Sequence, residues 1–322
     1  MSPLAKTIYN TVFNFLLEHQ WIDRVKKSFG KSEAERYAEL NIGSGGLDIL
    51  DAVHCVMDEG RTKTFLETID ALVKPSYIVI EAGVGTGILS LLAAALGAKV
   101  YGVELNPGVF SLAEEIRDNA LQNKIIPPDS IILTKDDATI WIPPEKANII
   151  ISENIYTGMF YEKQVQIMNH LRKFFKNGGI AIPSEMKSFI ILTKTEFPHT
   201  LKHGEPFAPS KEENRIYPSI ELSNPVLYDH IVFTQETSIH FEKEFLIPVE
   251  KTGQINGLTI YSPVRMPNNT EIGRFNTTFF NNDLIIALGE PMDVQKGDRV
   301  KVKMIYERGG KPEESTFSVN LV

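Results

Sequence analysis

The sequence predicts an α/β domain with a parallel sheet, preceded by helices and followed by an antiparallel β domain. Between residues 77 and 183, short apolar runs alternate with helical patterns, which is typical of parallel strands covered on both faces. After Pro183 the helical periodicity stops, and β-branched and aromatic residues alternate with polar ones. We therefore predict a domain boundary near residue 184. The expected segments are helical 1–65, parallel-sheet 66–184 and β-rich 185–322.

The N-terminal segment has the pattern of helices. Residues 4–29 place apolar side chains, such as Ile8 and Val12, at the spacing of one helical face. We expect this face to pack on the next domain. The glycine-rich stretch NIGSGGLDIL (41–50) indicates a turn or hinge, and a second helical pattern covers residues 47–73.

The parallel-sheet segment contains five predicted strands with helices between most of them. The strands are expected at residues 77–82, 99–104, 130–134, 147–152 and 179–183. The helices are expected at residues 88–97, 109–122 and 161–176. Because the strands are continuously apolar rather than alternating, they should be buried on both faces.

Composition limits the class of protein. The chain has 43% apolar residues, one cysteine (Cys55) and a formal net charge of −8. There is no run of basic residues to follow a phosphate backbone, so we expect no nucleic-acid partner. We expect no membrane span and no signal peptide, since no apolar run is long enough. A single cysteine excludes an intrachain disulfide, and a cytoplasmic location is the simplest expectation.

The stretch EAGVGTG (81–87) joins the first predicted strand to its helix. Gly83, Gly85 and Gly87 allow a sharp turn and a close approach of backbone N–H groups to a ligand. A dinucleotide fingerprint reads G-x-G-x-x-G, whereas here the glycines run G-x-G-x-G with Glu81 two positions ahead. This spacing favours S-adenosylmethionine (SAM) over a nicotinamide dinucleotide. A tight turn without a ligand is the remaining alternative.

Two further positions fit the same cofactor. Glu104 ends the second strand, where its carboxylate could accept both hydroxyls of a ribose. Asp137 follows the third strand and could accept from the adenine amino group, while Ala138 leaves room for the ring. We therefore expect Glu81, the three glycines, Glu104 and this pair to bind the cofactor.

Three stretches resemble the protein arginine methyltransferases. GVGTGILSLLAAALGAKVYGVE is similar to the cofactor loop and helix of that family, and MDEGRT (57–62) is similar to its D-E-x-R-T segment. IIISENIYTGMFYE resembles its double-E loop, with Glu153 and Glu162 at the family's separation. GGIAIP also resembles the strand that enters the family's β domain.

The resemblance implies a SAM-binding Rossmann-like domain with an N-terminal helical segment and a C-terminal antiparallel β-barrel-like domain. It also implies that Arg61 pairs with the methionine carboxylate of SAM, and that Glu153 and Glu162 clamp a cationic nitrogen. A homodimer is a further expectation, with residues 199–230 as the candidate dimerisation segment.

Two parts of the family pattern are missing. The family's Y-F-x-x-Y aromatics would fall on Ile42, Gly43 and Gly46, with Tyr37 the nearest upstream tyrosine. The family's threonine-histidine-tryptophan loop has no counterpart, because the last histidine is His240 and the last tryptophan lies far upstream. The nature of the acceptor therefore stays open.

The leading hypothesis is a SAM-dependent N-methyltransferase acting on a guanidino or other cationic nitrogen, carried by a protein side chain or a small molecule. The alternatives are a small-molecule methyltransferase on the same scaffold and a non-catalytic SAM-binding protein. We expect no metal site, since His54, Cys55 and His170 share no metal-ligand spacing.

Overall fold

The computed structural model describes residues 1–28, 48–197, 206–207, 219–278 and 282–322. The chain divides into two compact units, which we describe separately. The first unit contains Met1–Asn154, Ile167–Ser184 and Arg265–Ile272, and the second contains Ile155–Gln166, Glu185–Val264 and Gly273–Val322. Residues 42, 43 and 46, where the family's aromatics would fall, lie outside the described residues. So do most of residues 199–218, which are part of the candidate dimerisation segment.

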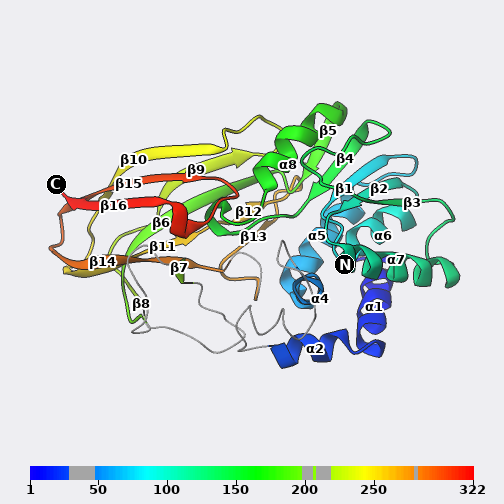
Figure 1. Ribbon diagram of the computed structural model, residues 1–322, viewed down its shortest axis with the longest axis horizontal. Coiled ribbons are helices and arrows are strands. Elements are labelled where there is room, and N and C mark those ends of the chain that lie inside the picture. The colour runs from blue at the N-terminus through cyan, green and yellow to red at the C-terminus, as the bar shows by residue number, and fades with distance from the viewer. Residues whose placement is uncertain (29–47, 198–205, 208–218, 279–281) are drawn as a thin grey trace. The chain divides into compact units, whose positions relative to one another are not determined.

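The first unit is built on a five-stranded parallel sheet in the order β3-β2-β1-β4-β5 (Figure 1). The strands are β1 (Ile78–Ala82), β2 (Lys99–Glu104), β3 (Ile131–Lys135), β4 (Ala147–Ser152) and β5 (Phe175–Ile182). Every residue of β1 is buried, as is all but one of β4. The predicted parallel sheet is thus confirmed. Burial on both faces holds for β1 and β4 but not for the edge strands β3 and β5, which carry exposed residues because a neighbouring strand covers only one of their sides.

Helices accompany this sheet. They are α1 (Pro3–Glu18), α2 (Trp21–Ser28), α4 (Ile49–Met57), α5 (Glu59–Leu72), α6 (Ile88–Ala95) and α7 (Pro107–Gln122). The chain continues through α8 (Gln164–Leu171) and the short 3-10 helix η2 (Arg172–Phe174) into β5. The expected apolar face of α1 is buried, with Ile8 and Val12 fully covered.

A backbone turn and side-chain caps set the helix boundaries. The helical pattern expected over residues 4–29 forms two helices instead of one, because Gln20 adopts a left-handed φ of 62° between α1 and α2. Asp48 forms a capping box with Asp51 at the start of α4. Asp58 ends α4 and caps α5, accepting from the Arg61 N–H at 3.2 Å.

The second unit contains two antiparallel sheets, which confirms the predicted β-rich C-terminal domain. One sheet has β6, β11, β14 and β7 in order, with β8 and β9 also paired to β6; the other has the order β10-β15-β16. The strands of the first sheet are β6 (Glu185–Thr195), β7 (Pro206–Phe207), β8 (Ser219–Glu221), β9 (Val226–Val232), β11 (Gly253–Tyr261) and β14 (Leu284–Val294). The others are β10 (His240–Pro248), β15 (Arg299–Glu307) and β16 (Thr316–Leu321). Closure into a barrel stays a prediction.

Alternation explains the core of this second unit. Along β15 every second residue is buried, including Val300, Val302 and Met304, while the residues between them are more exposed. These side chains join a cluster with Phe160 and Tyr228. The second unit also contains two 3-10 helices, η1 (Thr157–Met159) and η3 (Pro312–Glu314). The short strand β12 (Val264–Arg265) lies at the division between the units, and β13 (Glu271–Ile272) belongs to the first unit.

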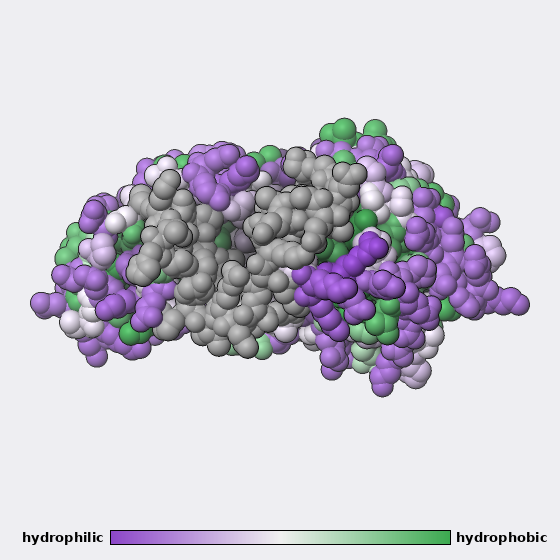
Figure 2. Space-filling model, turned by 60° about the horizontal axis from the view of Figure 1, so that its bottom comes forward, coloured by the Kyte–Doolittle hydropathy of each residue, from purple (hydrophilic) through white to green (hydrophobic). Residues whose placement is uncertain are grey.

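On the face shown in Figure 2, purple residues predominate among those described, with smaller green areas between them. No helix among the described residues is both long and apolar enough to cross a membrane.

Candidate functional site

The glycine loop follows β1 at the carboxyl edge of the parallel sheet. Gly83, Gly85 and Gly87 have φ angles of 75°, 58° and 77°, a region that side chains disfavour. The Gly83 N–H donates to the Val103 carbonyl at 2.9 Å, which ties the loop to the end of β2. Gly87 is then the N-cap residue of helix α6, which has no side-chain cap. The backbone therefore makes the sharp turn that the sequence predicts.

This loop lies beside the switch point of the sheet. From β1 the chain proceeds outward to β2 and β3, and then returns to place β4 on the other side of β1. Ligands of such sheets bind outside the carboxyl ends of the strands at the point where the order reverses. Ala82 pairs with Val103 on one side and Ser152 on the other, so the ends of β1, β2 and β4 are level.

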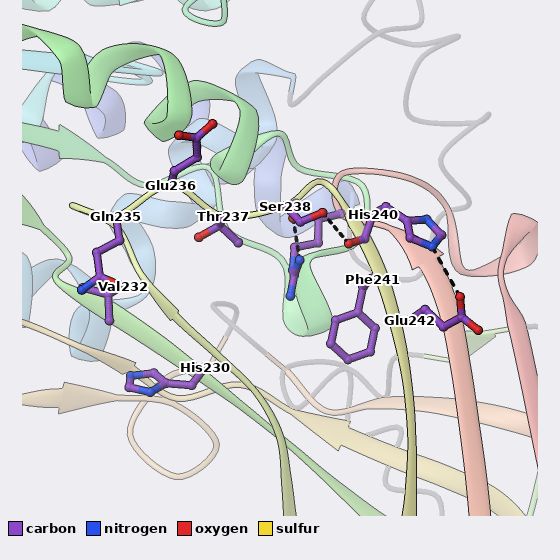
Figure 3. Close-up of a pocket in the computed structure, with 10 residues that line it drawn as sticks. His230, Val232, Gln235, Glu236, Thr237, Ser238, His240, Phe241 and Glu242 are labelled. Carbon is purple, nitrogen blue, oxygen red and sulfur yellow. Dashed lines mark hydrogen bonds and ion pairs between the residues drawn. The ribbon is translucent and has the colours of Figure 1, made fainter.

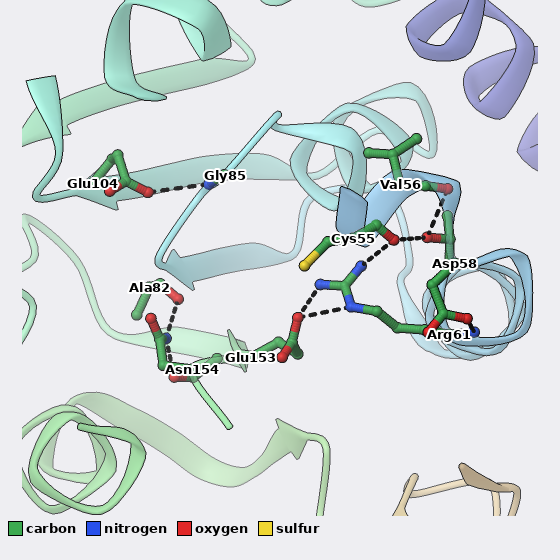
Figure 4. A network of polar contacts seen from close by, with 11 residues as sticks. Cys55, Val56, Asp58, Arg61, Ala82, Gly85, Glu104, Glu153 and Asn154 are labelled. Atoms are coloured by element: carbon green, nitrogen blue, oxygen red, sulfur yellow. Dashed lines mark hydrogen bonds and ion pairs between the residues drawn. The ribbon is translucent and has the colours of Figure 1, made fainter. Parts of the chain in front are cut away.

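Glu104 contacts the glycine loop directly. One carboxylate oxygen accepts from the Gly85 N–H at 3.1 Å, and the other accepts from the Asn106 N–H at 2.9 Å. Burial raises the pKa of Glu104, although these backbone donors oppose the shift. Figure 4 shows this carboxylate directed at Gly85. The structure thus brings together two of the predicted cofactor residues.

Asp137 and Ala138 follow β3 on the same edge of the sheet. One Asp137 carboxylate oxygen accepts from the Thr139 N–H at 2.8 Å and from its hydroxyl at 2.7 Å. Ala138 is buried. Because Glu104 pairs with Lys135 across β2 and β3, this turn begins next to the ribose-binding candidate.

Glu81 lies within β1 and faces helix α6. Its carboxylate accepts from the Ser90 hydroxyl, and only 2% of the residue is exposed. Burial raises its pKa to about 8, with the Ser90 hydrogen bond acting in the opposite direction. This contact was not predicted, and it gives Glu81 a partner within the protein.

Arg61 and Glu153 form a buried ion pair at the switch point. The Nε of Arg61 donates to Oε2 of Glu153 at 2.8 Å, and Nη2 contacts the same oxygen. Nη1 lies 3.4 Å from the Cys55 carbonyl oxygen. Figure 4 shows the guanidinium directed between Glu153 and Cys55. Arg61 is 6% exposed, so both charges are largely removed from water.

Burial and the charge of Glu153 set the pKa of Arg61, and burial sets the pKa of the adjacent Cys55. Burial alone would lower the pKa of Arg61, but the charge of Glu153 raises it above its ordinary value. Burial raises the pKa of the Cys55 thiol, which keeps it protonated and poorly nucleophilic. The arginine therefore remains charged while the cysteine stays neutral.

Asn154 was missed by the sequence reasoning. Its amide Nδ2 donates to the Ala82 carbonyl at 2.8 Å and to the Ser152 hydroxyl at 3.1 Å. A Cβ added to Gly83 would lie 2.5 Å from Oδ1 of Asn154. The residue next to Glu153 therefore packs against the glycine loop. No spacing in the sequence predicts this contact.

Glu162 belongs to the second unit, whereas Glu153 belongs to the first. The Glu162 N–H donates to the Phe160 carbonyl at 2.6 Å, and the residue is half-buried. Burial raises the pKa of nearby Tyr156 to about 12, with smaller contributions from the charges of Glu313 and Glu162. The clamp of two glutamates stays a prediction.

In the part of the chain that the structure describes, no group of three His, Cys, Asp or Glu residues lies close enough together to hold a metal ion. His170 instead contacts the Trp141 carbonyl at 2.7 Å.

Comparisons of sequence place the chain near methyltransferases. The family model of ribosomal protein L11 methyltransferase (PrmA) matches residues 58–193. An uncharacterised protein of Methanocaldococcus jannaschii is 29% identical over 82% of this chain and 93% of its own length. Protein arginine N-methyltransferase 1 of Chlamydomonas reinhardtii is 34% identical over 40% of this chain and 37% of its own length. The chain thus spans little more than a third of that named enzyme.

Two solved structures share the fold. The Trypanosoma brucei PRMT1 enzyme-prozyme heterotetrameric complex with AdoHcy has a TM-score of 0.66 at 18% identity, covering 84% of this chain and 92% of that one. Protein arginine methyltransferase 10 of Arabidopsis thaliana has a TM-score of 0.61 at 15% identity, covering 83% and 95%. With the sequence relatives, they confirm the predicted fold class and the predicted resemblance.

Proposed function

We propose that this chain, a class I SAM-dependent methyltransferase similar to the protein arginine methyltransferases, methylates a guanidino or other cationic nitrogen. The observation that carries the proposal is the contact between Glu153 and Arg61. One carboxylate oxygen at the end of β4 accepts from two N–H groups of a single guanidinium. An arginine-like acceptor needs a carboxylate with this capacity.

The residues at the edge of the sheet fit SAM as the cofactor. A Cβ on Gly85 would meet no atom closer than Ala52 Cβ at 4.0 Å, so this side of the loop has room for a ligand. A carboxylate has about four acceptor sites, so Glu104 can hold a ribose diol in addition to two backbone N–H groups. Asp137 and Ala138 would hold the adenine ring.

Arg61 would hold the carboxylate of the methionine part. A guanidinium has about five N–H donors, and three of them are directed at Glu153 and Cys55. Gly83 and Gly87 would shape the loop around the cofactor, and Glu81 would support the loop from β1. SAM supplies an electrophilic methyl group.

The glutamates would act on the acceptor. A guanidinium is a poor nucleophile because its lone pairs are delocalised. Carboxylates that bind its N–H groups draw positive charge onto those nitrogens, which leaves the remaining nitrogen more nucleophilic. We assign this role to Glu153 and Glu162, one of which would accept the released proton directly or through water.

A small-molecule acceptor on the same scaffold is the second candidate. It is favoured by the missing threonine-histidine-tryptophan loop, because no histidine follows His240 and no tryptophan follows Trp141. A smaller acceptor has less need of residues that line a channel for a protein side chain.

The test is incubation of the purified chain with methyl-labelled SAM and separate pools of proteins, peptides and small cationic metabolites. We expect label in one pool, and at least about a hundred-fold loss for Glu153→Gln and Glu162→Gln if both act on the acceptor. Glu115→Gln, on the exposed side of α7, is the matched control. Label only in the small-molecule pool selects the second candidate. SAM binding without label in any pool would contradict catalysis and indicate a SAM-binding protein.

A further inference from the structure

The backbone before Glu162 makes a three-residue turn centred on Tyr161. The Glu162 N–H closes it by donating to the Phe160 carbonyl at 2.6 Å, and Tyr161 has a φ of 59°. Met159 also has a positive φ, of 62°, and follows Gly158 at 71°. Two non-glycine residues in this region within three positions are uncommon. Such conformations persist only where surrounding contacts impose them.

A glycine turn after β15 supplies those contacts. The Gly309 N–H donates to the Met159 carbonyl at 2.7 Å, and the Tyr161 N–H donates to the Gly310 carbonyl at 2.8 Å. Gly309 has a φ of 84°, and a Cβ there would lie 2.7 Å from Nε2 of Gln166. The turn thus holds the two strained residues on either side of Phe160.

The glycine turn is itself fixed by Arg308. This guanidinium donates to Oδ2 of Asp229 at 2.8 and 3.1 Å and to the Ser238 carbonyl at 2.5 Å, and it lies over the Phe241 ring at 5.0 Å. The Arg308 carbonyl accepts from the Gln166 side chain at 2.6 Å. Figure 3 shows the surroundings of Ser238 and Phe241, which with Arg308 line a pocket of about 460 Å³. Arg308 is 6% exposed, so this anchor is buried.

The Tyr161 side chain is held separately. Its hydroxyl donates to the Glu313 carboxylate, with distances of 3.1 and 3.4 Å to the two oxygens. Its ring meets Tyr156 edge-on, at 4.9 Å between centroids. Tyr161 is 37% exposed, so these contacts hold a side chain that contributes little to the core.

We propose that Tyr161, fixed by Glu313 and by the turn at Gly309 and Gly310, is a positioning residue for Glu162. The inference rests on the proposed function, in which Glu162 binds the acceptor. The three-residue turn transmits the position of Tyr161 to the next residue, and a small displacement of a reacting group lowers the rate strongly. Tyr161 itself touches neither the acceptor nor the cofactor in this role.

The test compares Tyr161→Phe, Glu313→Ala and Glu313→Gln. We expect kcat to fall about three- to ten-fold in the first two, with little change in the Kd for SAM, because one hydrogen bond that orients a group is lost. Glu313→Gln retains an acceptor for the hydroxyl and should stay within about two-fold of the parent. The control Glu314→Ala removes the same charge from the neighbouring exposed residue and should leave kcat unchanged.

Hydrogen exchange provides a second readout that does not need turnover. The Glu162 amide should exchange faster in Tyr161→Phe and Glu313→Ala than in Glu314→Ala. Unchanged kcat and unchanged exchange in both variants would overturn the proposal, and so would an equal loss of kcat in Glu313→Gln and Glu313→Ala. Faster exchange combined with full activity of Glu162→Gln would instead refute the role of Glu162 on the acceptor.

Discussion

Arg61 and Glu153 are 92 positions apart in the sequence and form a buried ion pair through Nε, Nη2 and a single carboxylate oxygen. The resemblance assigns the arginine to the cofactor and the glutamate to the acceptor. Under the proposed function, their contact links the cofactor side of the site to the acceptor side through one ion pair. A change in the position or charge of either residue should therefore affect both sides.

The first prediction concerns the stability of this pair. Glu153→Gln leaves a buried guanidinium without its counter-charge, and removing one partner of a buried pair costs about 3–5 kcal/mol. The double variant Arg61→Met with Glu153→Gln removes both charges and should recover part of that loss. Urea unfolding of the parent, both single variants and the double variant measures the coupling. Additive losses would show that the two residues are not coupled.

Cofactor binding should depend on the shape of the Arg61 side chain as well as its charge. Arg61→Lys keeps the charge but loses the planar fork of donors, so we expect the Kd for SAM to rise at least about ten-fold. Titration calorimetry with SAM checks this. Arg117→Lys is the matched control, since Arg117 pairs with Glu114 and Asp118 on its own helix. Equal affinity of Arg61→Lys and the parent would refute the assignment to the methionine carboxylate.

The glycine loop offers a comparison that separates backbone strain from steric overlap. Gly83 and Gly178 have nearly equal φ angles of 75° and 74°, but a Cβ would meet Asn154 at 2.5 Å in the first and no atom within 4 Å in the second. Alanine at either position should cost about 1–2 kcal/mol from the left-handed backbone. Gly83→Ala should cost more and should also weaken SAM binding, which Gly178→Ala should not. Thermal unfolding and calorimetry distinguish them, and identical losses would contradict the predicted overlap.

Glu81 should make stability depend on pH. Its pKa rises from 4.5 to about 8 on burial, so between these values the folded protein holds a proton that the unfolded chain has released. Stability should therefore fall as pH increases from about 4.5 to 8, by at most about 1.4 kcal/mol per pH unit. Glu81→Gln should remove this slope, since glutamine carries no titrating proton. Urea unfolding across this range measures it, with Glu115→Gln as control, and an unchanged slope in Glu81→Gln would exclude this origin.

The fold was largely readable from the sequence because its signals are local. Continuous apolar runs predicted all five parallel strands, and β1, β2 and β4 begin and end within one residue of expectation. The ends of the helices were harder to predict from the sequence. The break at Gln20 depends on a left-handed φ, and no glycine or proline at that position indicates a break. The division near residue 184 and the three segment boundaries stay predictions.

The candidate site was readable only in part. The glycines and Glu104 follow from the spacing of strand ends, and the structure places them together. The pairing of Arg61 with Glu153 and the packing of Asn154 on Gly83 join distant segments, so no local pattern contains them. Likewise, nothing in the letters of the sequence indicates that Tyr161 centres a strained turn, because the conformation is imposed by contacts from elsewhere in its unit.

The packing of Asn154 against Gly83 has a consequence for engineering and for evolution. Under the proposed function, residues around Glu153 are the targets for changing which acceptor is methylated. A larger side chain at 154 would push on the cofactor loop, whose glycine has no side chain to give way. Substitutions at these two positions should therefore be epistatic, so that a new acceptor preference at one is accessible only with compensation at the other.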